Sequence, residues 1–281
     1  MKPDPRFVGL PPDFWAHVRL VSEGLGYSVR KTKKRPSSLR TYTSQQVRGW
    51  LSPRGSLDRY VQETEIGGQT YLVRLLDYLN ARAAVLGAIA PNLMNRDQAR
   101  KVFRDLKRRL KPKCLLPLNK QKGEKRHEAY LTCIVNMLTE QALGGCHFAQ
   151  SPGALATVRR DGRLLRTFSR RYDGAYPDTA NPTAVWEIKE YYGTTTFGSR
   201  VADGVYETML DGYELAELRD NENLHIDHYL IVDDRYTWWD CGKSYLCRIV
   251  DALHTGMIDE VIFGREVLVR WPQIVDQWPR A

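Results

Sequence analysis

The sequence predicts an α/β (α+β) protein: a mixed central sheet flanked by helices, preceded by a mainly helical basic N-terminal region. Charge divides the chain, because residues 1–127 hold 27 Lys and Arg against 10 Asp and Glu, a net +17, whereas residues 128–281 hold 15 against 23, a net −8. A polar connection at 111–125, rich in residues that break helices, separates a helical region from one in which helices and strands alternate. The elements after it alternate between helix and strand, which favours a mixed sheet with helices against it. We therefore expect a basic helical region at 1–112 and a second domain at 113–281.

The composition excludes several classes of protein. The chain has 281 residues, of which 42% are hydrophobic, so it can form a packed core. It contains no run of ~18 apolar residues for a membrane span and no apolar leader of signal-peptide length. We expect a cytoplasmic protein without a membrane partner. No Walker loop and no Gly-x-Gly-x-x-Gly fingerprint are present, so we expect no nucleotide cofactor.

The cysteines argue for reduced thiols. Five is an odd number for a disulfide framework, and their spacing does not match a zinc finger. The five are Cys114, Cys133, Cys146, Cys241 and Cys247. We expect them to be structural side chains and not ligands.

The first region carries clear helix signals. Thr43 begins a capping-box pattern. Apolar residues recur at helical spacing over 71–86 until Pro91 interrupts them. A second helix is predicted at 95–110, with an apolar stripe and basic remaining faces. The basic stretch 29–40 contains Ser and Pro and reads as a loop or arm.

The second domain opens with a helix and a hairpin. An amphipathic helix is predicted over 127–143, ended by two glycines. Strands at 154–160 and 164–173 flank Asp161-Gly162, a strong hairpin turn.

The remaining elements alternate. We expect a third strand at 184–191, reached by a loop that contains two prolines. A helix at 203–218, a strand at 226–232, a helix at 243–253 and a last strand at 261–269 follow. The order is helix, three strands, helix, strand, helix, strand.

Two carboxylates and a lysine stand out in this pattern. Alternate residues of a strand share a face, so Glu187 and Lys189 point one way while Trp186 and Ile188 point into the core. A hairpin centred near residue 180 would place Asp173 opposite Glu187, with about 5 Å between Cβ atoms. Two such carboxylates can share one divalent cation, and an ammonium beside them can hold a phosphate and favour deprotonated water.

An Asp on one strand followed by Glu-x-Lys on the next resembles the PD-(D/E)xK nuclease superfamily, which includes most type II restriction endonucleases. The element order is similar too, so the resemblance covers roughly residues 126–270. It implies a restriction-endonuclease-like core, Mg²⁺ as cofactor, and Asp173, Glu187 and Lys189 as the catalytic triad, with the metal on Asp173 and Glu187. The family often adds an acidic residue from the helix before the strands, and Glu128 is the match as an outer or second-metal ligand.

The sequence departs from the family pattern at one point. The literal Pro-Asp dipeptide is Pro177-Asp178, about five residues into the hairpin loop, which puts Asp178 up to ~16 Å from Glu187. We favour Asp173 because its place relative to the sheet matters more than the dipeptide. Glu187 and Lys189 could instead form an exposed ion pair on an edge strand, and Glu128 could be a solvated glutamate favoured by a helix dipole.

The basic first region predicts a polyanionic partner. A polar loop at 193–200 follows the Glu187 strand, and its amides, threonines and arginine could contact phosphates or simply face solvent. The candidate DNA-binding residues are Lys101, Arg104, Lys107, Arg108, Lys33, Lys34, Arg35 and Arg200.

Other chemistry-bearing residues are expected to be structural. His225, His228 and His254 lack ligand spacing and lie among apolar residues. The aromatic cluster at 236–239 is expected in core or dimer packing in preference to base stacking.

These patterns together predict an Mg²⁺-dependent endonuclease that cuts double-stranded DNA, most similar to a type II restriction enzyme acting as a homodimer. A repair or structure-specific nuclease on the same core, a non-catalytic DNA-binding regulator and a nuclease for RNA are the alternatives. The recognised bases, the cut position and the base-reading residues are not specified by the sequence.

Overall fold

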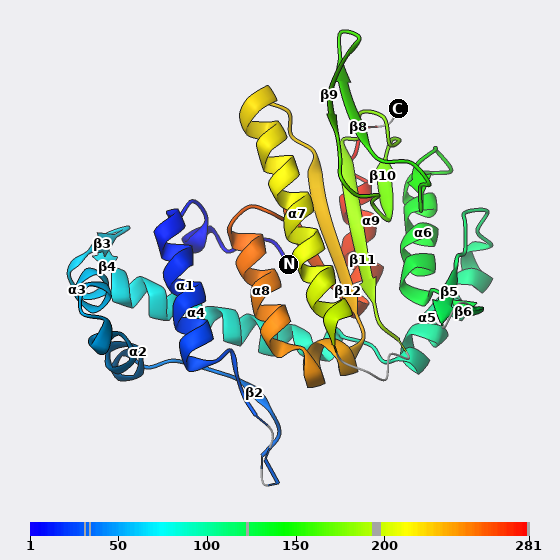
Figure 1. The fold of residues 1–281 in the computed structure, drawn as a ribbon. Helices are drawn as coiled ribbons and strands as arrows, with labels where there is room; N and C mark the ends of the chain where they lie inside the picture. The colour runs from blue at the N-terminus through cyan, green and yellow to red at the C-terminus, as the bar shows by residue number, and fades with distance from the viewer. Residues whose placement is uncertain (31, 34, 122–123, 193–197, 280–281) are drawn as a thin grey trace.

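The computed structural model describes residues 1–279 apart from 31, 34, 122–123 and 193–197, and the side chains of 120–121, 124–126 and 199 also lie outside this description. Within it the chain is a mixed α/β protein with a five-stranded sheet between helices, and a helical N-terminal region to one side (Figure 1). No helix in the described part is long and apolar enough to cross a membrane.

The N-terminal region is mainly helical, as the sequence predicts. Its helices are α1 (Pro12–Leu25), α2 (Ser44–Leu51), α3 (Ser56–Glu63), α4 (Tyr71–Ile89) and α5 (Arg96–Leu110). Two short hairpins interrupt them, formed by β1 (Ser28–Val29) with β2 (Ser38–Leu39) and by β3 (Glu65–Ile66) with β4 (Gln69–Thr70). The basic arm predicted at 29–40 is therefore the hairpin that β1 and β2 close.

The helix signals in this region act as expected. The Thr43 hydroxyl accepts from the Gln46 amide, and the Gln46 side chain accepts from the Thr43 amide, so the capping box at the start of α2 is complete. Asn95 and Gln98 form the same reciprocal pair at the start of α5. Pro91 lies in the 3₁₀ turn that ends α4. Local hydrogen-bond chemistry thus sets these helix boundaries.

The central sheet is mixed. Its order is β13 (Glu260–Phe263), β12 (Asp227–Asp233), β11 (Ala184–Glu190), β10 (Gly174–Tyr176), β7 (Ala149–Gln150). The pairs β11–β12 and β12–β13 are parallel, and the pairs β10–β11 and β10–β7 are antiparallel. The accompanying helices are α6 (Tyr130–Ala142), α7 (Ser199–Glu222), α8 (Lys243–His254) and α9 (Val267–Val275).

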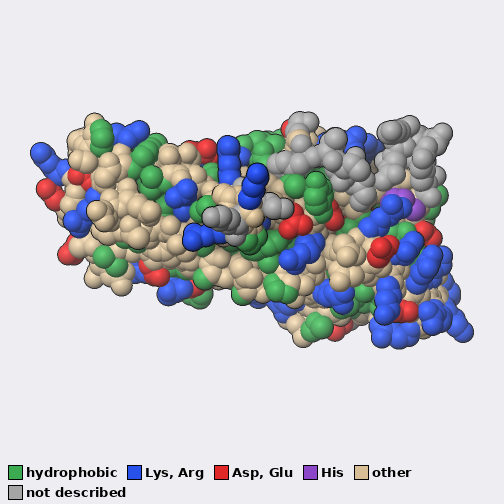
Figure 2. Space-filling model, turned by 90° about the horizontal axis from the view of Figure 1, so that it is seen from below, with side chains coloured by type: hydrophobic (Ala, Val, Ile, Leu, Met, Phe, Trp, Pro, Cys, Tyr) green, Lys and Arg blue, Asp and Glu red, His purple; other side chains and the backbone are tan. Residues whose placement is uncertain are grey.

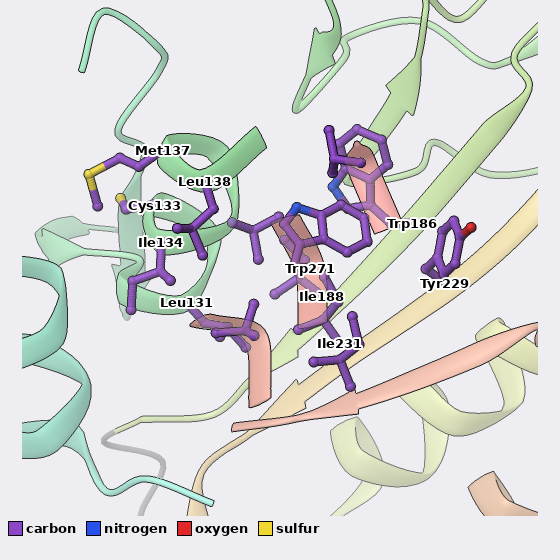
Figure 3. Close-up of a cluster of buried hydrophobic side chains, with 14 of the residues drawn as sticks. Leu131, Cys133, Ile134, Met137, Leu138, Trp186, Ile188, Tyr229, Ile231 and Trp271 are labelled. Atoms are coloured by element: carbon purple, nitrogen blue, oxygen red, sulfur yellow. The ribbon is translucent and has the colours of Figure 1, made fainter. Parts of the chain in front are cut away.

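Helices cover both faces of the sheet. Trp186 and Ile188 of β11 pack with α6 and α9, and Figure 3 shows Leu131 and Leu138 of α6 on the side of that helix toward Trp271. Leu230 of β12 belongs to the opposite cluster, which α7 and α8 close. Because alternate strand residues serve opposite faces, Glu187 and Lys189 lie on the α7 side.

Helix α4 joins the N-terminal region to the sheet domain. Arg82 of α4 donates to both carboxylate oxygens of Asp251 in α8 at 2.8 Å, and the Tyr78 hydroxyl donates to the same carboxylate at 2.5 Å. Arg82 is almost fully buried, so Asp251 supplies the charge that its guanidinium requires. The basic helix α5, in turn, packs against α6 in the same apolar cluster as β11.

Two predicted boundaries are wrong around the first helix of the second domain. The helix predicted over 127–143 begins only at Tyr130. Residues 127–128 end a strand, β6 (Glu124–Glu128), that pairs with β5 (Leu118–Gln121) inside the predicted connection. The pairing depends on a partner strand that helical periodicity does not reveal.

Two strand predictions also need correction. The Asp161-Gly162 turn joins β8 (Thr157–Arg160) to β9 (Arg163–Thr167) as predicted, but this hairpin is a separate two-stranded sheet, and the strand before β11 is β10. The last strand stops at Phe263, because Glu266 accepts from the Phe263 amide and a 3₁₀ turn leads into α9.

All five cysteines are free, which confirms the prediction of reduced thiols.

Candidate active site

The register of β10 and β11 sets the geometry of the site. Gly174 pairs with Trp186, so the next position places Asp173 opposite Glu187, as a hairpin centred at residue 180 requires. The Asp173 amide donates to the Trp186 carbonyl at 3.1 Å, and its Oδ2 accepts from the Ile188 amide at 2.7 Å. Asp173 is therefore held by the backbone of β11 on both sides of Glu187.

Gly174 makes this approach possible. A Cβ atom on Gly174 would lie 2.0 Å from Cε2 of the Trp186 indole, well inside van der Waals contact. The indole of Trp186 is fully buried in the cluster below the sheet. In the Asp173-Gly174 dipeptide, Asp173 thus supplies the carboxylate, and the missing side chain of Gly174 leaves room for the Trp186 indole of the partner strand.

Glu187 and Lys189 form a buried ion pair on the α7 face of β11. Lys189 Nζ donates to Glu187 Oε2 at 2.8 Å, and the Glu187 side chain is only 2% exposed. Although burial opposes its charged form, the Glu187 carboxylate raises the pKa of Lys189. The reading of these residues as an exposed pair on an edge strand is wrong, because β11 is the central strand of five and Glu187 is buried.

Helix α7 adds two carboxylates that the sequence analysis missed. Glu207 Oε2 accepts from Lys189 at 3.1 Å, and Asp211, one turn further on, is 1% exposed. Arg170 links them, donating to Asp211 Oδ2 at 2.8 Å and Glu207 Oε2 at 3.0 Å, and it lies 3.8 Å from Glu187 Oε2. The signal that could have found them is an acidic stripe at helical spacing. It comprises Asp203, Glu207, Asp211 and Glu214.

The charges of these side chains do not balance. Asp173, Glu187, Glu207 and Asp211 carry four negative charges when ionised, whereas Lys189 and Arg170 carry two positive charges. Burial first, and the Glu187 carboxylate second, raise the pKa of Asp173 and of Asp211 to about 7. With all four carboxylates ionised the net charge would be −2, which is the charge that one divalent cation neutralises.

Unsatisfied acceptors mark the same place. Glu187 Oε1 and Asp211 Oδ1 are buried and accept no hydrogen bond from the described residues. The Tyr172 hydroxyl and His228 Nε2 are orphaned as well, and their rings lie 6.4 Å apart. His228 Nδ1 pairs with the Met257 carbonyl, and burial lowers the pKa of this histidine. Buried acceptors normally have a donor or a cation, and a divalent ion is one group that would satisfy these oxygens.

Glu128 does not lie where the sequence analysis expected it. It ends strand β6 and pairs with Leu118, outside α6, so the first-turn helix position is wrong. No hydrogen bond or ion pair among the described side chains joins it to Glu187. The carboxylate at the start of α6 belongs instead to Glu190, which accepts from the Leu131 amide and the Thr132 hydroxyl, both at 2.9 Å.

Asp178 lies apart from this site. Its Oδ1 accepts from the Thr179 amide at 2.6 Å, and its Oδ2 lies 3.7 Å from the exposed His147 ring. The preference for Asp173 over the literal Pro-Asp dipeptide agrees with this geometry.

The basic candidates lie on the surface. Lys101, Arg104, Lys107 and Arg108 are exposed on α5, and Figure 2 shows Lys and Arg side chains gathered at that end of the molecule. Lys33, Arg35 and Arg200 are also exposed. Lys34 lies outside the described residues, as does most of the 193–200 loop.

The remaining candidates have structural roles, with one exception. Trp238 is fully buried against α8, which confirms core packing for this residue of the 236–239 cluster, whereas Tyr236 is 49% exposed. His254 accepts from the Asp4 amide at 3.0 Å and is structural. His225 instead approaches Asp227 and Asp259, with ligand atoms within 4.8 Å of one another. Parallel strands bring this partly exposed group together, and His–Asp spacing along the chain does not predict it.

The fold and the site define a mixed α/β protein with a buried carboxylate–lysine centre. Residues 94–278, about two thirds of the chain, match the family described as a domain of unknown function (DUF7687), and the chain belongs to that family. Residues 1–89 match a second family, described as a domain of unknown function (DUF7690). No curated protein and no solved structure matches the chain.

Proposed function

We propose that this protein is an Mg²⁺-dependent endonuclease that hydrolyses phosphodiester bonds of double-stranded DNA. The observation that carries the proposal is the Asp173–Glu187 pair across two antiparallel strands, with Lys189 hydrogen-bonded to the buried Glu187 carboxylate. This combination suits phosphodiester hydrolysis, which needs a cation, an activated water and a group that stabilises developing negative charge.

The sheet supports a restriction-endonuclease-like core. Helix α6 precedes the antiparallel strands β7, β10 and β11, and α7 then leads to β12, which is parallel to β11. That is the helix, three strands, helix, strand order that accompanies the Asp and Glu-x-Lys pattern. The β8–β9 hairpin is an insertion outside the sheet.

In the proposed mechanism Asp173 and Glu187 would hold the cation, which would supply a Lewis acid and lower the pKa of a bound water. Glu187 can do so without losing its lysine, because Lys189 and Arg170 approach Oε2 and leave Oε1 without a donor. The Lys189 ammonium would contact the scissile phosphate and favour deprotonation of the attacking water. Burial keeps these charges strong by limiting solvent screening.

Basic helix α5 would hold the phosphate backbone. Its exposed residues Lys101, Arg104, Lys107 and Arg108 supply positive charge that does not depend on DNA sequence. The likeness to type II restriction enzymes extends the proposal to cleavage at a defined site by a homodimer, with one active site for each strand. Sedimentation with and without duplex DNA tests the dimer.

Incubation with plasmid and phage DNA in Mg²⁺ or EDTA tests the activity. We expect discrete fragments that require Mg²⁺ and disappear in Glu187→Ala. Glu217→Gln is the matched control, because this α7 carboxylate is 58% exposed and pairs with Arg166 away from the site.

The other outcomes separate the alternatives. Smears that disappear in Glu187→Ala would keep the nuclease and reject site specificity. Cleavage confined to branched DNA or to RNA would indicate a structure-specific or RNA-directed nuclease. Intact DNA that still shifts on a gel, equally with Glu187→Ala, would reject the nuclease in favour of a DNA-binding protein.

A further inference from the structure

A cavity of about 280 Å³ lies where α1, α7 and α8 meet, on the side of α7 away from the candidate active site. In Figure 1 these three helices stand side by side, with α8 between α1 and α7. Ligand pockets in proteins begin at about 300 Å³, so this cavity suits a single ring system and not a large cofactor.

Aromatic side chains from α1, from α7 and from the residue before β1 line this cavity. Tyr206 and Tyr213 of α7 are 52% and 55% exposed, and they lie seven residues apart on one face of the helix. Trp15 of α1 lines the opposite side, and Tyr27 lies below Arg248 at 5.3 Å from its ring centroid. Exposed aromatic faces with an arginine beside them form a surface on which a flat ring can stack.

Polar groups at the cavity are already held in place. Arg248 donates to Glu23 at 2.7 Å and to the Tyr206 hydroxyl at 2.9 Å, which leaves further N–H groups of its five. The Asp251 carboxylate is oriented by buried Arg82 at 2.8 Å. A fixed donor and a fixed acceptor can read the edge of a ring that carries both kinds of group.

The charge of the cavity favours an anion attached to that ring. Arg19 and Arg248 lie at its lining against Glu23 and Asp251, and Arg82 neutralises Asp251 from below. The balance is therefore positive. We infer that this cavity binds the base of a nucleotide, stacked on Tyr206 and Tyr213, with its phosphate toward Arg19.

The ring could come from a free nucleotide or from an unpaired nucleotide of a nucleic acid, and both offer the same chemistry. The site does not depend on the proposed nuclease activity. Tyr206 and Tyr213 line the cavity, whereas Glu207 and Asp211 face β11 from the other side of α7.

Fluorescence of 2-aminopurine tests the inference, because stacking on an aromatic side chain quenches it. The probes are 2-aminopurine riboside monophosphate, a single-stranded oligonucleotide with one 2-aminopurine, and the same strand in a duplex. All are titrated into full-length Glu187→Ala protein in EDTA, so that cleavage cannot intervene. We expect saturable quenching, weakened roughly tenfold by Tyr213→Ala and by Tyr206→Ala.

Two further variants make the result specific. Tyr206→Phe keeps the ring and should keep the quenching, which separates stacking from loss of fold. Tyr236→Ala removes a comparably exposed tyrosine outside the cavity and should change nothing. Quenching by the monophosphate assigns a nucleotide site, and quenching by the single strand alone assigns an unpaired base. No quenching with any probe, or quenching that survives both alanine variants, would overturn the inference.

Discussion

Arg170 donates from Nη1 to Oδ2 of Asp211 at 2.8 Å, which ties the segment before β10 to the inner face of α7. The Asp211 side chain is 1% exposed and that of Arg170 25%. This ion pair therefore lies largely out of solvent, directly behind Glu187. Arg170 lies between the carboxylates of Asp211 and Glu187, and its positive charge reduces the repulsion between them in the interior.

Removing Arg170 should destabilise the fold. In Arg170→Ala the Asp211 carboxylate loses its ion-pair partner inside the protein, and the loss of one partner of a buried pair costs roughly 3–5 kcal/mol. We expect a loss of about 3 kcal/mol in the free energy of unfolding, measured by urea titration in EDTA. The double variant Arg170→Ala with Asp211→Asn should recover part of it. Arg171→Ala, next along the chain and exposed, is the control; an equal loss there would contradict this account.

Stability should fall as pH rises toward neutrality when no divalent cation is present. Burial and the nearby Glu187 raise the pKa of Asp211 to about 7, above its ordinary value of 3.8, although Arg170 and Lys189 oppose the shift. The folded state then holds this proton more tightly than the unfolded state between these values. The contribution of protonated Asp211 is full at low pH and is lost as pH rises to about 7.

Asp211→Asn isolates this contribution. Each such group changes the free energy of unfolding by up to about 1.4 kcal/mol per pH unit, so over the two units between pH 5 and 7 the variant should lose about 2 kcal/mol less stability than the parent. Urea titrations at pH 5, 6, 7 and 8 in EDTA measure the slope. Asp173 has a pKa raised to about 7 by the same causes, so a residual slope is expected. Identical slopes in parent and variant would reject the assignment to Asp211.

The register of Asp173 against Glu187 was predictable from local signals, although the strand that carries it, β10, lies in the predicted loop. Residues that alternate between core and site at 186–189 set the face, and the hairpin centre sets the register of Asp173 against Glu187. The capping box at Thr43 predicted its helix start for the same reason.

The rest of the site depends on tertiary contacts. Arg170 and Asp211 meet only because α7 crosses over β11, and the acidic stripe of α7 does not by itself state which strand it faces. Glu128 was misplaced because the partner strand of β6 lies ten residues earlier and removes it from the helix. Glu190 caps a helix that begins sixty residues before it, a contact that only the folded chain creates.

Gly174 should tolerate no larger residue. Alanine at this position puts a methyl group 2.0 Å from the Trp186 indole, and overpacking of this kind costs roughly 1–3 kcal/mol. We expect a stability loss of about 3 kcal/mol and altered near-ultraviolet circular dichroism, since Trp186 must move. Gly153→Ala is the matched control, because a methyl group there meets no atom within 4 Å and stability should stay within about 0.5 kcal/mol. An unchanged tryptophan signal in Gly174→Ala would show that the indole does not depend on this contact.

A divalent cation should stabilise the fold through Asp173 and Glu187. Ca²⁺ at about 100 times its dissociation constant should add about 2.7 kcal/mol to the free energy of unfolding, because it binds the folded state alone. Thermal unfolding in Ca²⁺ and in EDTA measures the shift, which Glu187→Gln should abolish by removing one carboxylate charge. His225→Ala should retain it, because the His225, Asp227 and Asp259 group is partly exposed and built from other strands. The reverse pattern, with the shift lost in His225→Ala and kept in Glu187→Gln, would show that the cation binds the His225, Asp227 and Asp259 group. The buried carboxylates would then be neutralised by Lys189 and Arg170 alone.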